Sequence, residues 1–540
     1  MALITLTSGN DQAPPPAIAP DDTVYGLTGN DTITAPNGTF VFGNEGNDVL
    51  TVSNNSIANG NQGNDVLTGA GTGVTLFGGQ GNDTLRSVSS SVLFGDGGNP
   101  SVSGVTYNDS LFSVFADTLY GGLGSDTLIV APSSAAFGGK DNDTLMAISS
   151  GAPNATLAGD GGDDVIMGAG TGGSKLYGDR TDFDSLTVGN DTIWAFGNDT
   201  AYGGGGNDSL VAFGGVKLMY GNQGDDVLRF ADTVTSGTGA TLYGGQGNDT
   251  LLGKNGGALL YGDKGNDSLV ASTGPGNIFD TLVGGAGADN LVGTDQAEVL
   301  IGGADSIPGL DTTTGADLIN AKSGDDTIVA GGGGSTVSGA DGRDSMIGGK
   351  GNDSFLGGNG DDTLIGGAGN DSLQGWTGSD SLTGGDGADF FIFVGGTFVT
   401  SAFFSNADGI SSIANAANAS ELNGKLGGID TITDFLPGTD RIVLDGKGTR
   451  FTGFGLPAGE ALFQTLATDQ VPGVAVINVT SNVSVIADQS SGILVYNTAD
   501  GSLWYNADAA ATSGGNDRAV QFLFLQPGLT SLSSTDFLIV

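Results

Sequence analysis

Turn residues and apolar residues follow one another in a regular pattern along most of this 540-residue chain. Residues 46–50 (Gly-Asn-Asp-Val-Leu) and residues 369–373 (Gly-Asn-Asp-Ser-Leu) are two distant copies of one phrase. A strand takes about 3–5 residues and a tight turn takes about as many. Each copy therefore predicts a turn that leads into a short strand. The apolar residue, such as Leu50, Leu67 or Leu85, is expected to point inward into a thin stacked core.

The spacing of the aspartates in this phrase predicts how the strands stack. The first aspartates, beginning with Asp31 and Asp48, lie 17 or 18 residues apart, whereas those between Asp317 and Asp389 follow a 9-residue grid whose one gap is Ser335. About 9 residues make half a coil and about 18 make a full coil. The early region should then carry acidic turns on one edge of the coils, and the late region on both edges.

These features predict an all-β fold, a parallel β-roll or β-helix solenoid followed by a β-rich C-terminal domain. We expect an N-terminal arm and proline-rich linker (1–23), a solenoid with mainly single-edge acidic turns (24–279), a β-roll with acidic turns on both edges (280–394) and the C-terminal domain (395–540), with one helix at 410–422. Extra residues near 97–107, 178–189, 231–240 and 303–315 interrupt the repeat. Because stacked coils must stay in contact, these insertions should form surface loops.

The N-terminal arm allows two interpretations. Residues 2–7 (Ala-Leu-Ile-Thr-Leu-Thr) have the composition of a strand, and the prolines at 14–16 are typical of an extended linker. The arm either caps the first coil of its own chain or is donated to the open edge of a neighbouring subunit.

Composition narrows the chemistry that the chain can perform. It has 60 acidic and 16 basic residues, a net charge of -44, no cysteine and no histidine. This excess of acids disfavours nucleic acid and anionic membranes as partners, because both require basic patches. Without cysteine or histidine, disulfides, thiolate metal sites, His-ligated zinc and His-activated nucleophiles are excluded.

Residues 1–7 do not resemble a cleaved signal peptide, and no stretch approaches the ~20 apolar residues of a membrane span. We therefore expect no membrane insertion.

The turns instead have the chemistry of calcium sites. Ca²⁺ takes 6–8 oxygen ligands and tolerates irregular geometry. Glycines allow backbone carbonyls to converge, an aspartate supplies charge, and coils stacked roughly 4.8 Å apart let two turns share one ion. A metal-free solenoid with asparagine and aspartate turns is the alternative.

Glu298 stands at a position where the repeat has an aspartate, so it is left out of the predicted calcium ligands. The predicted calcium ligands are Asp31, Asp48, Asp65, Asp83, Asp126, Asp143, Asp164, Asp208, Asp226, Asp249, Asp267, Asp289, Asp317, Asp326, Asp344, Asp353, Asp362, Asp371, Asp380 and Asp389, with glycines Gly348, Gly349, Gly351, Gly366, Gly367 and Gly369.

Residues 348–356 (Gly-Gly-Lys-Gly-Asn-Asp-Ser-Phe-Leu) and 366–374 (Gly-Gly-Ala-Gly-Asn-Asp-Ser-Leu-Gln) resemble the nonapeptide of RTX (repeats-in-toxin) proteins. The resemblance covers about residues 24–394 and implies a right-handed parallel β-roll with calcium in its turns. Residues 429–435 and 438–442 resemble the segment that usually follows such repeats. Residues 534–540 resemble an uncleaved type I secretion signal, which implies the type I export machinery as a transient partner.

The resulting hypothesis is a secreted protein that folds on calcium and assembles with itself at the cell surface, as an S-layer, sheath or filament. RTX proteins commonly place an effector ahead of the repeats, but here the repeats begin near residue 24. A calcium-dependent adhesin is the first alternative, with cell-surface polysaccharide as a further candidate partner. An ice-binding adhesin is disfavoured, because threonine precedes Gly-Asn-Asp at Thr28 but not in copies such as residues 45–48. A secreted enzyme with a carboxylate pair is the second alternative, although no spacing supports a particular pair, and we expect no catalytic activity.

Overall fold

The structure is a computed structural model that describes residues 2–13, 18–96, 106–148, 154–170, 173–180, 188–216, 218–231, 239–254, 257–272, 280–294, 298–303, 315–394, 430–445, 475–479, 493–497, 502–506, 519–525, 529, 532 and 536–539. The regular secondary structure of these residues is β-strand. The helix expected at 410–422 and the prolines at 14–16 lie outside the described residues. No helix in the described ranges is long and apolar enough to cross a bilayer.

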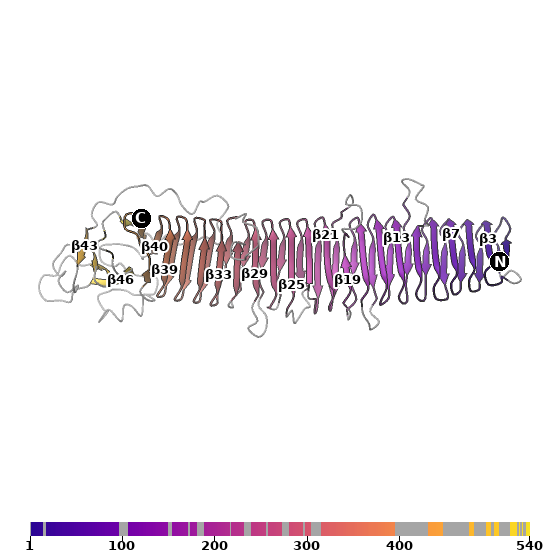
Figure 1. Cartoon of the computed structure of the whole chain (residues 1–540), viewed down its shortest axis with the longest axis horizontal. Helices are drawn as coiled ribbons and strands as arrows, with labels where there is room; N and C mark the ends of the chain where they lie inside the picture. Colours follow the sequence, from indigo (N-terminus) through magenta and orange to yellow (C-terminus); the bar gives the residue numbers. More distant parts are fainter. Residues whose placement is uncertain are drawn as a thin grey trace, which may run out of the picture. The chain divides into compact units, whose positions relative to one another are not determined.

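The chain forms two compact units, Met1–Asp280 and Thr281–Val540. In each unit the chain winds into coils, and each coil contributes one strand to each of two parallel sheets. Figure 1 shows the strands of each unit side by side, from indigo to magenta in the first and toward orange and yellow in the second. The predicted all-β parallel solenoid is confirmed.

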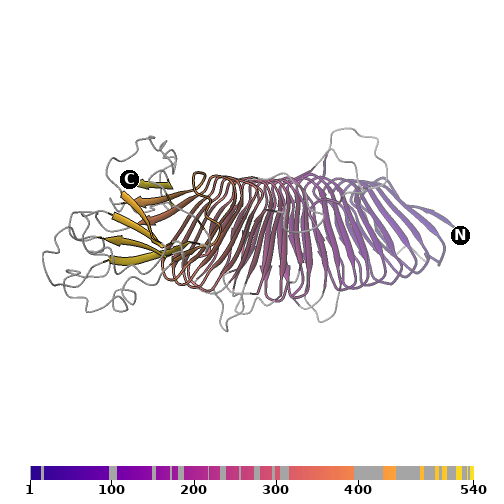
Figure 2. The ribbon, with the colours of Figure 1, turned by 60° about the vertical axis from the view of Figure 1, so that its left-hand side comes forward.

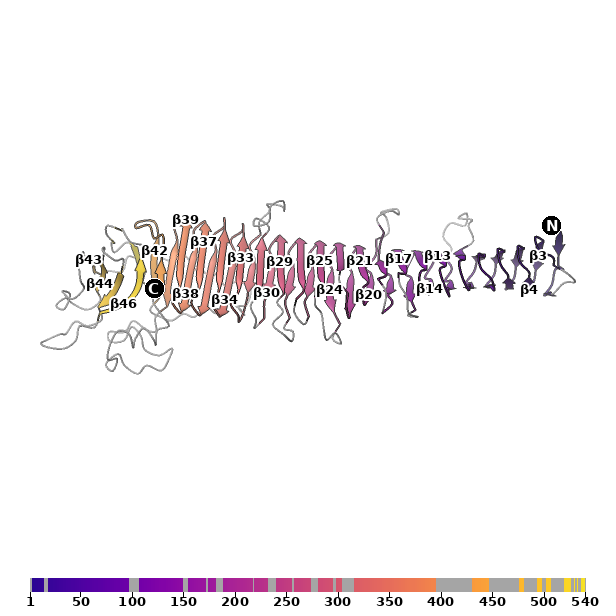
Figure 3. The same ribbon diagram turned by 60° about the horizontal axis from the view of Figure 1, so that its bottom comes forward.

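The first unit has one sheet, sheet A, whose strands carry odd numbers, and another, sheet B, whose strands carry even numbers. Figure 3 labels strands of the two kinds along opposite sides of this unit. Sheet A contains β1 (Leu3–Thr5), β3 (Thr23–Thr28), β5 (Phe40–Glu45), β7 (Ile57–Gln62), β9 (Thr75–Gln80), β11 (Val92–Asp96), β13 (Thr118–Leu123), β15 (Ala135–Lys140), β17 (Thr156–Gly161), β19 (Lys175–Tyr177), β21 (Thr200–Gly205), β23 (Leu218–Gln223), β25 (Thr241–Gln246) and β27 (Leu259–Lys264). Sheet B contains β2 (Gln12–Ala13), β4 (Thr32–Ala35), β6 (Val49–Val52), β8 (Val66–Gly69), β10 (Thr84–Arg86), β12 (Ser110–Phe112), β14 (Thr127–Val130), β16 (Thr144–Ala147), β18 (Val165–Met167), β20 (Thr192–Phe196), β22 (Ser209–Phe213), β24 (Val227–Phe230), β26 (Thr250–Leu252) and β28 (Ser268–Val270).

The register of these strands follows the sequence repeat. Leu50 pairs with Leu67 in sheet B, one coil further on, and Leu67 pairs with Leu85. All three leucines are completely buried, as predicted. Side chains alternate between the two faces of a strand, so one or two residues of each strand, such as Leu50 and Val52 of β6, fill the narrow core. The buried apolar residue after each aspartate, together with its counterparts in sheet A such as Val41 and Leu76, holds the two sheets together.

The second unit has the same architecture in sheets C and D. Sheet C contains β29 (Thr281–Ala286), β31 (Val299–Gly303), β33 (Thr327–Gly331), β35 (Ser345–Gly349), β37 (Thr363–Ala368), β39 (Ser381–Asp386) and β41 (Asp430–Ile432), followed by β46 (Ala519–Leu525), β45 (Ser502–Asn506), β44 (Ile493–Asn497) and β43 (Ala475–Val479). Sheet D contains β30 (Asn290–Val292), β32 (Leu318–Asn320), β34 (Thr336–Asp341), β36 (Ser354–Asn359), β38 (Ser372–Thr377), β40 (Phe390–Val394), β42 (Arg441–Asp445) and β47 (Phe537–Ile539). Partners such as Leu364 and Leu382 lie one 18-residue coil apart.

The strands after residue 394 continue the coils of the second unit. β41 pairs in parallel with β39, β42 with β40, and β47 with β42. The chain also adds two antiparallel pairings, β44 with β45 and β45 with β46, which Figure 2 shows in yellow. Since β46 also pairs in parallel with β41, the described part of the region expected as a C-terminal domain contains four strands that extend the parallel sheets, namely β41, β42, β46 and β47.

The N-terminal arm lies on the first coil of its own chain. β1 pairs with β3 and β2 pairs with β4, both in parallel. Of the two interpretations, the structure has the intramolecular cap. Leu3 remains 70% exposed, since no strand of the described chain covers the outer side of β1.

The insertions do not interrupt the stacking of the coils in the first unit. Phe94 pairs with Tyr120, Tyr177 with Tyr202, and Tyr220 with Tyr243, in each case across one of the insertions expected from the sequence. Most of the inserted residues lie outside the described ranges. A coil can therefore carry extra residues in one turn while its strands keep their register.

Candidate calcium sites in the turns

The predicted aspartates of the first unit form one column along the edge where the chain enters sheet B. The backbone N–H of each aspartate donates to Oδ1 of the aspartate one coil further on, with N–O distances of 2.7 Å from Asp48 to Asp65 and from Asp208 to Asp226. Each carboxylate is at most 2% exposed. The predicted members of this column are Asp31, Asp48, Asp65, Asp83, Asp126, Asp143, Asp164, Asp208, Asp226, Asp249 and Asp267.

The second oxygen of most of these carboxylates has no hydrogen-bond partner within the described chain. Oδ2 is buried and unpaired at Asp31, Asp48, Asp65, Asp83, Asp126, Asp143, Asp164, Asp208, Asp226 and Asp249. A buried polar atom is normally satisfied, because an unmet acceptor costs about 1–3 kcal/mol and a charged one costs more. A whole column of such oxygens indicates a binding partner that accepts electron pairs from oxygen, that is, a metal cation.

Electrostatics supports the same assignment. Burial raises the pKa of Asp126 and of Asp208 to about 9, and in both the neighbouring aspartates of the column raise it further. Burial likewise raises the pKa of Asp83 to about 8. The surroundings of these aspartates therefore disfavour the charged carboxylate. Only a bound cation or a proton can offset the cost of this buried negative charge.

The glycine that begins each turn leaves room beside the unpaired oxygen. A Cβ atom placed on Gly43 would collide with Oδ2 of Asp48 and lie 2.9 Å from the carbonyl oxygen of Gly60, one coil further on. On Gly366 it would collide with Oδ2 of Asp371 and lie 2.7 Å from the carbonyl oxygen of Gly384. A carboxylate oxygen and a backbone carbonyl from consecutive coils thus converge on a space that only glycine leaves open.

This donor set fits calcium. No three acidic side chains of the described chain converge on one point, so most ligands of a bound ion must be backbone carbonyls. Ca²⁺ accepts carboxylate and carbonyl oxygens in a flexible shell, which matches one aspartate and several glycine-rich turns. In each coil, the aspartate and the first glycine of the turn would hold the ion, and the ion would neutralise the buried charge.

The opposite edge of the first unit differs, although it too contains buried acids. Asp117 accepts hydrogen bonds from Ser91 N and Ser87 Oγ, both at 2.7 Å. Asp199 accepts from Ser174 N at 2.7 Å and from Phe196 N at 3.0 Å. With both oxygens satisfied, these carboxylates close turns, and they leave no acceptor for a cation.

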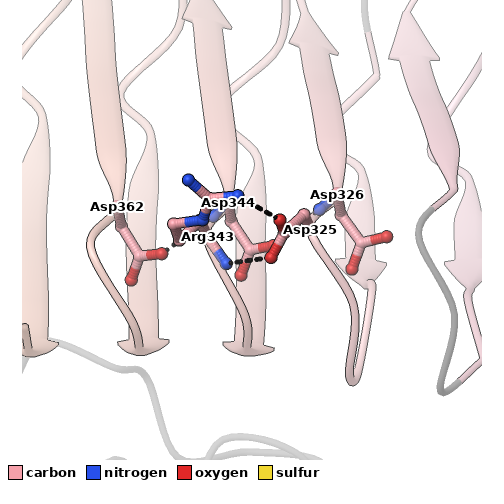
Figure 4. A network of polar contacts seen from close by, with 5 residues as sticks. All are labelled: Asp325, Asp326, Arg343, Asp344 and Asp362. Atoms are coloured by element: carbon pink, nitrogen blue, oxygen red, sulfur yellow. Dashed lines mark hydrogen bonds and ion pairs between the residues drawn. The ribbon is translucent and has the colours of Figure 1, made fainter.

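In the second unit buried carboxylates occupy both edges. Asp326, Asp344, Asp362 and Asp380 lie where the chain enters sheet C, and each has a buried, unpaired Oδ2. Figure 4 shows Asp326, Asp344 and Asp362 in consecutive coils, with the exposed ion pair between Arg343 and Asp325 beside them at 2.8 Å. The members at the sheet D edge are Asp289, Asp317, Asp353, Asp371 and Asp389.

Two positions in these columns show what replaces an unpaired carboxylate. Ser335 Oγ accepts from Asp317 N at 3.2 Å, and its own N donates to Asp353 Oδ1 at 2.7 Å, so the serine keeps the backbone contacts without charge. Glu298 accepts hydrogen bonds from N and Oγ1 of Thr294. Asp353 differs from its neighbours, because its Oδ2 accepts from Gly349 N at 3.2 Å.

The predicted glycines lie in the turns of β35 to β38. Gly348 and Gly366 face Oδ2 of Asp353 and Asp371. Gly367 and Gly369 have φ angles of 112° and 140°, which only glycine adopts readily. Gly349 and Gly351 cannot be replaced for lack of space, because a Cβ there would collide with Gly331 and Gly333 of the preceding coil.

Sequence reasoning missed several members of the columns. Asp109 and Asp191 belong to the first column, since each has a buried, unpaired Oδ2 and accepts from the preceding aspartate. Asp440 and Asp536 lie where the chain enters sheet D, and their carboxylates accept from Asp389 N and Gly438 N. Asp109 and Asp191 follow an asparagine in the usual way, so a search for the dipeptide without fixed spacing would have found them.

Comparison with protein families decides what these columns are. The family described as the RTX calcium-binding nonapeptide repeat matches residues 21–50, 59–87, 115–129, 187–210, 195–228, 230–258, 243–278, 276–306, 311–334, 321–355, 329–364 and 356–391. These segments together cover more than half of the chain. The chain belongs to this RTX family.

RTX nonapeptides are calcium-binding motifs, and the aspartate columns contain their acidic residues. Calcium is therefore the cofactor of the repeats. The search of curated proteins gives no significant match.

Proposed function

We propose that this RTX protein is a secreted structural protein that folds on calcium after export and assembles with itself at the cell surface as an S-layer, sheath or filament. The observation that carries the proposal is the column of buried carboxylates with an unpaired Oδ2. Because every coil adds such a charge, the solenoid is stable at neutral pH only when cations fill the turns.

The size of the repulsion explains why calcium would control folding. Carboxylates in neighbouring coils, about 5 Å apart, repel one another by roughly 3 kcal/mol at an effective dielectric constant of about 20. Since a domain is stabilised by only about 5–15 kcal/mol, several such pairs without cations exceed its whole stability. Metal binding and folding would then be one event.

The proposed affinity matches an extracellular location. Extracellular calcium modules have dissociation constants of about 10⁻⁴–10⁻³ M. The chain would stay unfolded where calcium is scarce and fold where it reaches millimolar levels, with the type I machinery as a partner during export. The repeats occupy most of the sequence, so the proposal gives them a structural role and assigns no catalytic activity to the chain.

Calcium titration of purified protein tests the proposal in two steps. Far-UV circular dichroism should show β-structure with roughly 5–10 mM calcium, which would saturate sites of this affinity, and a disordered spectrum with chelator. Magnesium at the same concentration is the control, because it prefers octahedral sites and keeps its waters.

Negative-stain electron microscopy of the same samples gives the second step. Sheets or fibres that form with calcium and disappear with chelator would support self-assembly. Folded monomers in calcium would contradict it and favour an adhesin that binds a cell-surface polysaccharide. A spectrum that chelator leaves unchanged would contradict the calcium requirement itself.

A further inference from the structure

Sheet A carries a row of stacked aromatic rings on its outer face. Because side chains alternate in a strand, the first and third residues of β3 to β27 point away from the core. The third residue is aromatic in nearly every strand. These residues are Tyr25, Phe42, Phe77, Phe94, Tyr120, Phe137, Tyr177, Tyr202, Tyr220, Tyr243 and Tyr261.

The rings are packed face to face along the sheet. From Tyr177 to Tyr261 five tyrosines on consecutive strands have ring centroids 4.9–5.0 Å apart and planes within 10° of parallel. Phe77, Phe94, Tyr120 and Phe137 form a second stack with spacings of 4.9–5.1 Å. Two of the strands that carry these tyrosines, β21 and β25, are labelled in Figure 1.

The break between the two stacks is filled by an arginine. Ala158 takes the place of a ring on β17, and the guanidinium of Arg180 lies 4.3 Å from the ring centroid of Phe137. Arg180 Nε also donates to Asp160 Oδ1 at 2.6 Å. The arginine thus covers the free face of Phe137 by a cation–π contact.

This geometry decides what the row can bind. A flat ligand that stacks on aromatic residues, such as a sugar ring, needs a free ring face. Here a ring inside a stack has both faces covered by neighbouring rings, and Arg180 covers the end face of Phe137. Most of the row is therefore a poor sugar platform, but the stacks and their tyrosine hydroxyls form a long strip that a second protein surface can cover.

The charge distribution on this face indicates which protein would cover it. Among the first and third residues of β3 to β27, Lys175 is the only charged one, although the whole chain carries a net charge of -44. Arg180, which lies on the Phe137 ring, is paired with Asp160. Two copies of such a chain repel one another wherever their acidic turns meet. The strip formed by the first and third residues of sheet A is a surface where they can approach with few like charges in opposition.

We propose that two copies of this chain associate through the outer faces of their A sheets, with the aromatic rows packed against each other about a two-fold axis. This inference rests on the proposed self-assembly and names its contact surface. From β3 to β27 the face is about 58 Å long at ~4.8 Å per strand, so a strip 10–15 Å wide buries roughly 1,200–1,700 Å² in total, the size of a stable interface. The contact is isologous, since the same patch serves both copies.

A matched pair of variants tests the proposal in folded protein with calcium. Tyr243→Glu with Tyr261→Glu places two carboxylates on adjacent strands of sheet A. Leu252→Glu with Val270→Glu places two on the paired strands β26 and β28 of sheet B, in the same two coils. All four side chains point outward and are partly exposed.

Sedimentation velocity should show association about 100-fold weaker for the tyrosine variant, because buried aromatic anchors dominate such contacts, and unchanged association for the sheet B variant. Unchanged association of the tyrosine variant, or loss in the sheet B variant alone, would overturn the surface while self-assembly stands. A folded wild-type monomer would overturn the surface and the self-assembly together.

A second measurement needs no variant and covers the case in which the tyrosine variant fails to fold. Nitration of the wild-type protein should modify Tyr202, Tyr220 and Tyr243 in dilute folded monomers, and these residues should be protected in assemblies. Equal nitration in both states would contradict the proposal.

Discussion

At the scale of residues, the turn asparagine and aspartate bind the coils together in opposite directions. Oδ1 of Asn30 accepts from Asn47 N, which lies one coil further on, at 2.8 Å. Oδ1 of Asp48 accepts from Asp31 N, which lies one coil earlier, at 2.7 Å. The pair Asn-Asp therefore satisfies backbone donors on both sides, and only Oδ2 of the aspartate is left over.

The leftover oxygen separates the calcium ligands from the other buried acids, and this gives a prediction. Asp208→Asn removes the charge of an unpaired oxygen and should lower the number of bound calcium ions by about one, because Ca²⁺ sites depend on carboxylate charge. Asp199→Asn is the control, since both oxygens of Asp199 accept backbone hydrogen bonds. It should leave the calcium count unchanged and lower the free energy of unfolding by about 1–3 kcal/mol. Equilibrium dialysis with calcium and thermal unfolding measure the two effects, and equal calcium loss in both variants would refute the distinction.

The raised pKa values predict an unusual pH dependence without calcium. In the metal-free fold, burial raises the pKa of Asp126 to about 9 and of Asp65 to about 7, above the ~3.9 of an unfolded aspartate. The folded chain then binds more protons than the unfolded chain, so its stability is fully present below pH ~4 and is lost as pH rises through these values. Chelated protein should gain β-structure by circular dichroism when acidified from pH 8 to pH 4. With calcium present, protons compete for the same oxygens, and the calcium midpoint should rise as pH falls. Chelated protein that stays disordered at pH 4 would contradict this account.

At the scale of elements, the strand and turn repeat could be predicted from the sequence because each residue type keeps the same role in every coil: glycine and aspartate form the turn, and leucine fills the core. The buried leucine after each aspartate and the spacing of 17–18 residues predicted the coils and their register. Asp109 and Asp191 were missed because they follow their predecessors by 26 and 27 residues, which hides them from a periodic search. The aromatic row was missed for a related reason: its members become neighbours only once the strands are in register.

The N-terminal arm shows a further limit of the spacing. Residues 9–11 (Gly-Asn-Asp) form one more turn, in which Asp11 N donates to Asp31 Oδ1 at 2.7 Å. The carboxylate of Asp11 has no preceding coil and instead accepts from Thr7 N at 2.7 Å. The arm is therefore a shortened first coil that ends the column.

Deleting residues 2–13 should uncover the edges of β3 and β4. We expect amide exchange in these two strands to become roughly tenfold faster or more, since they would lose their parallel partners. Exchange in β23 should not change, because each coil of a solenoid contacts only its neighbours. Hydrogen exchange read by mass spectrometry measures both. Unchanged exchange in β3 would show that the arm does not cap the coil in solution.

At the scale of the whole molecule, the two units differ in how many carboxylates of the columns each coil contains. A coil of the first unit has one such carboxylate, whereas coils between Asp344 and Asp389 have one at each edge. The denser unit suffers more repulsion without calcium and gains more binding free energy when calcium is present. Its folding should therefore respond more steeply to calcium concentration.

This difference predicts the order of folding after calcium is added. Asp344→Asn with Asp362→Asn should slow folding more than Asp48→Asn with Asp65→Asn, because the first pair weakens the unit that reaches its folding threshold first. Two tryptophans report the units separately: Trp376 lies on β38 and Trp194 on β20. In stopped-flow fluorescence of single-tryptophan variants, the Trp376 signal should change before that of Trp194. Because both probes experience the same calcium step, a simultaneous change would mean that site density does not set the order, and an earlier change at Trp194 would place the folding nucleus in the first unit.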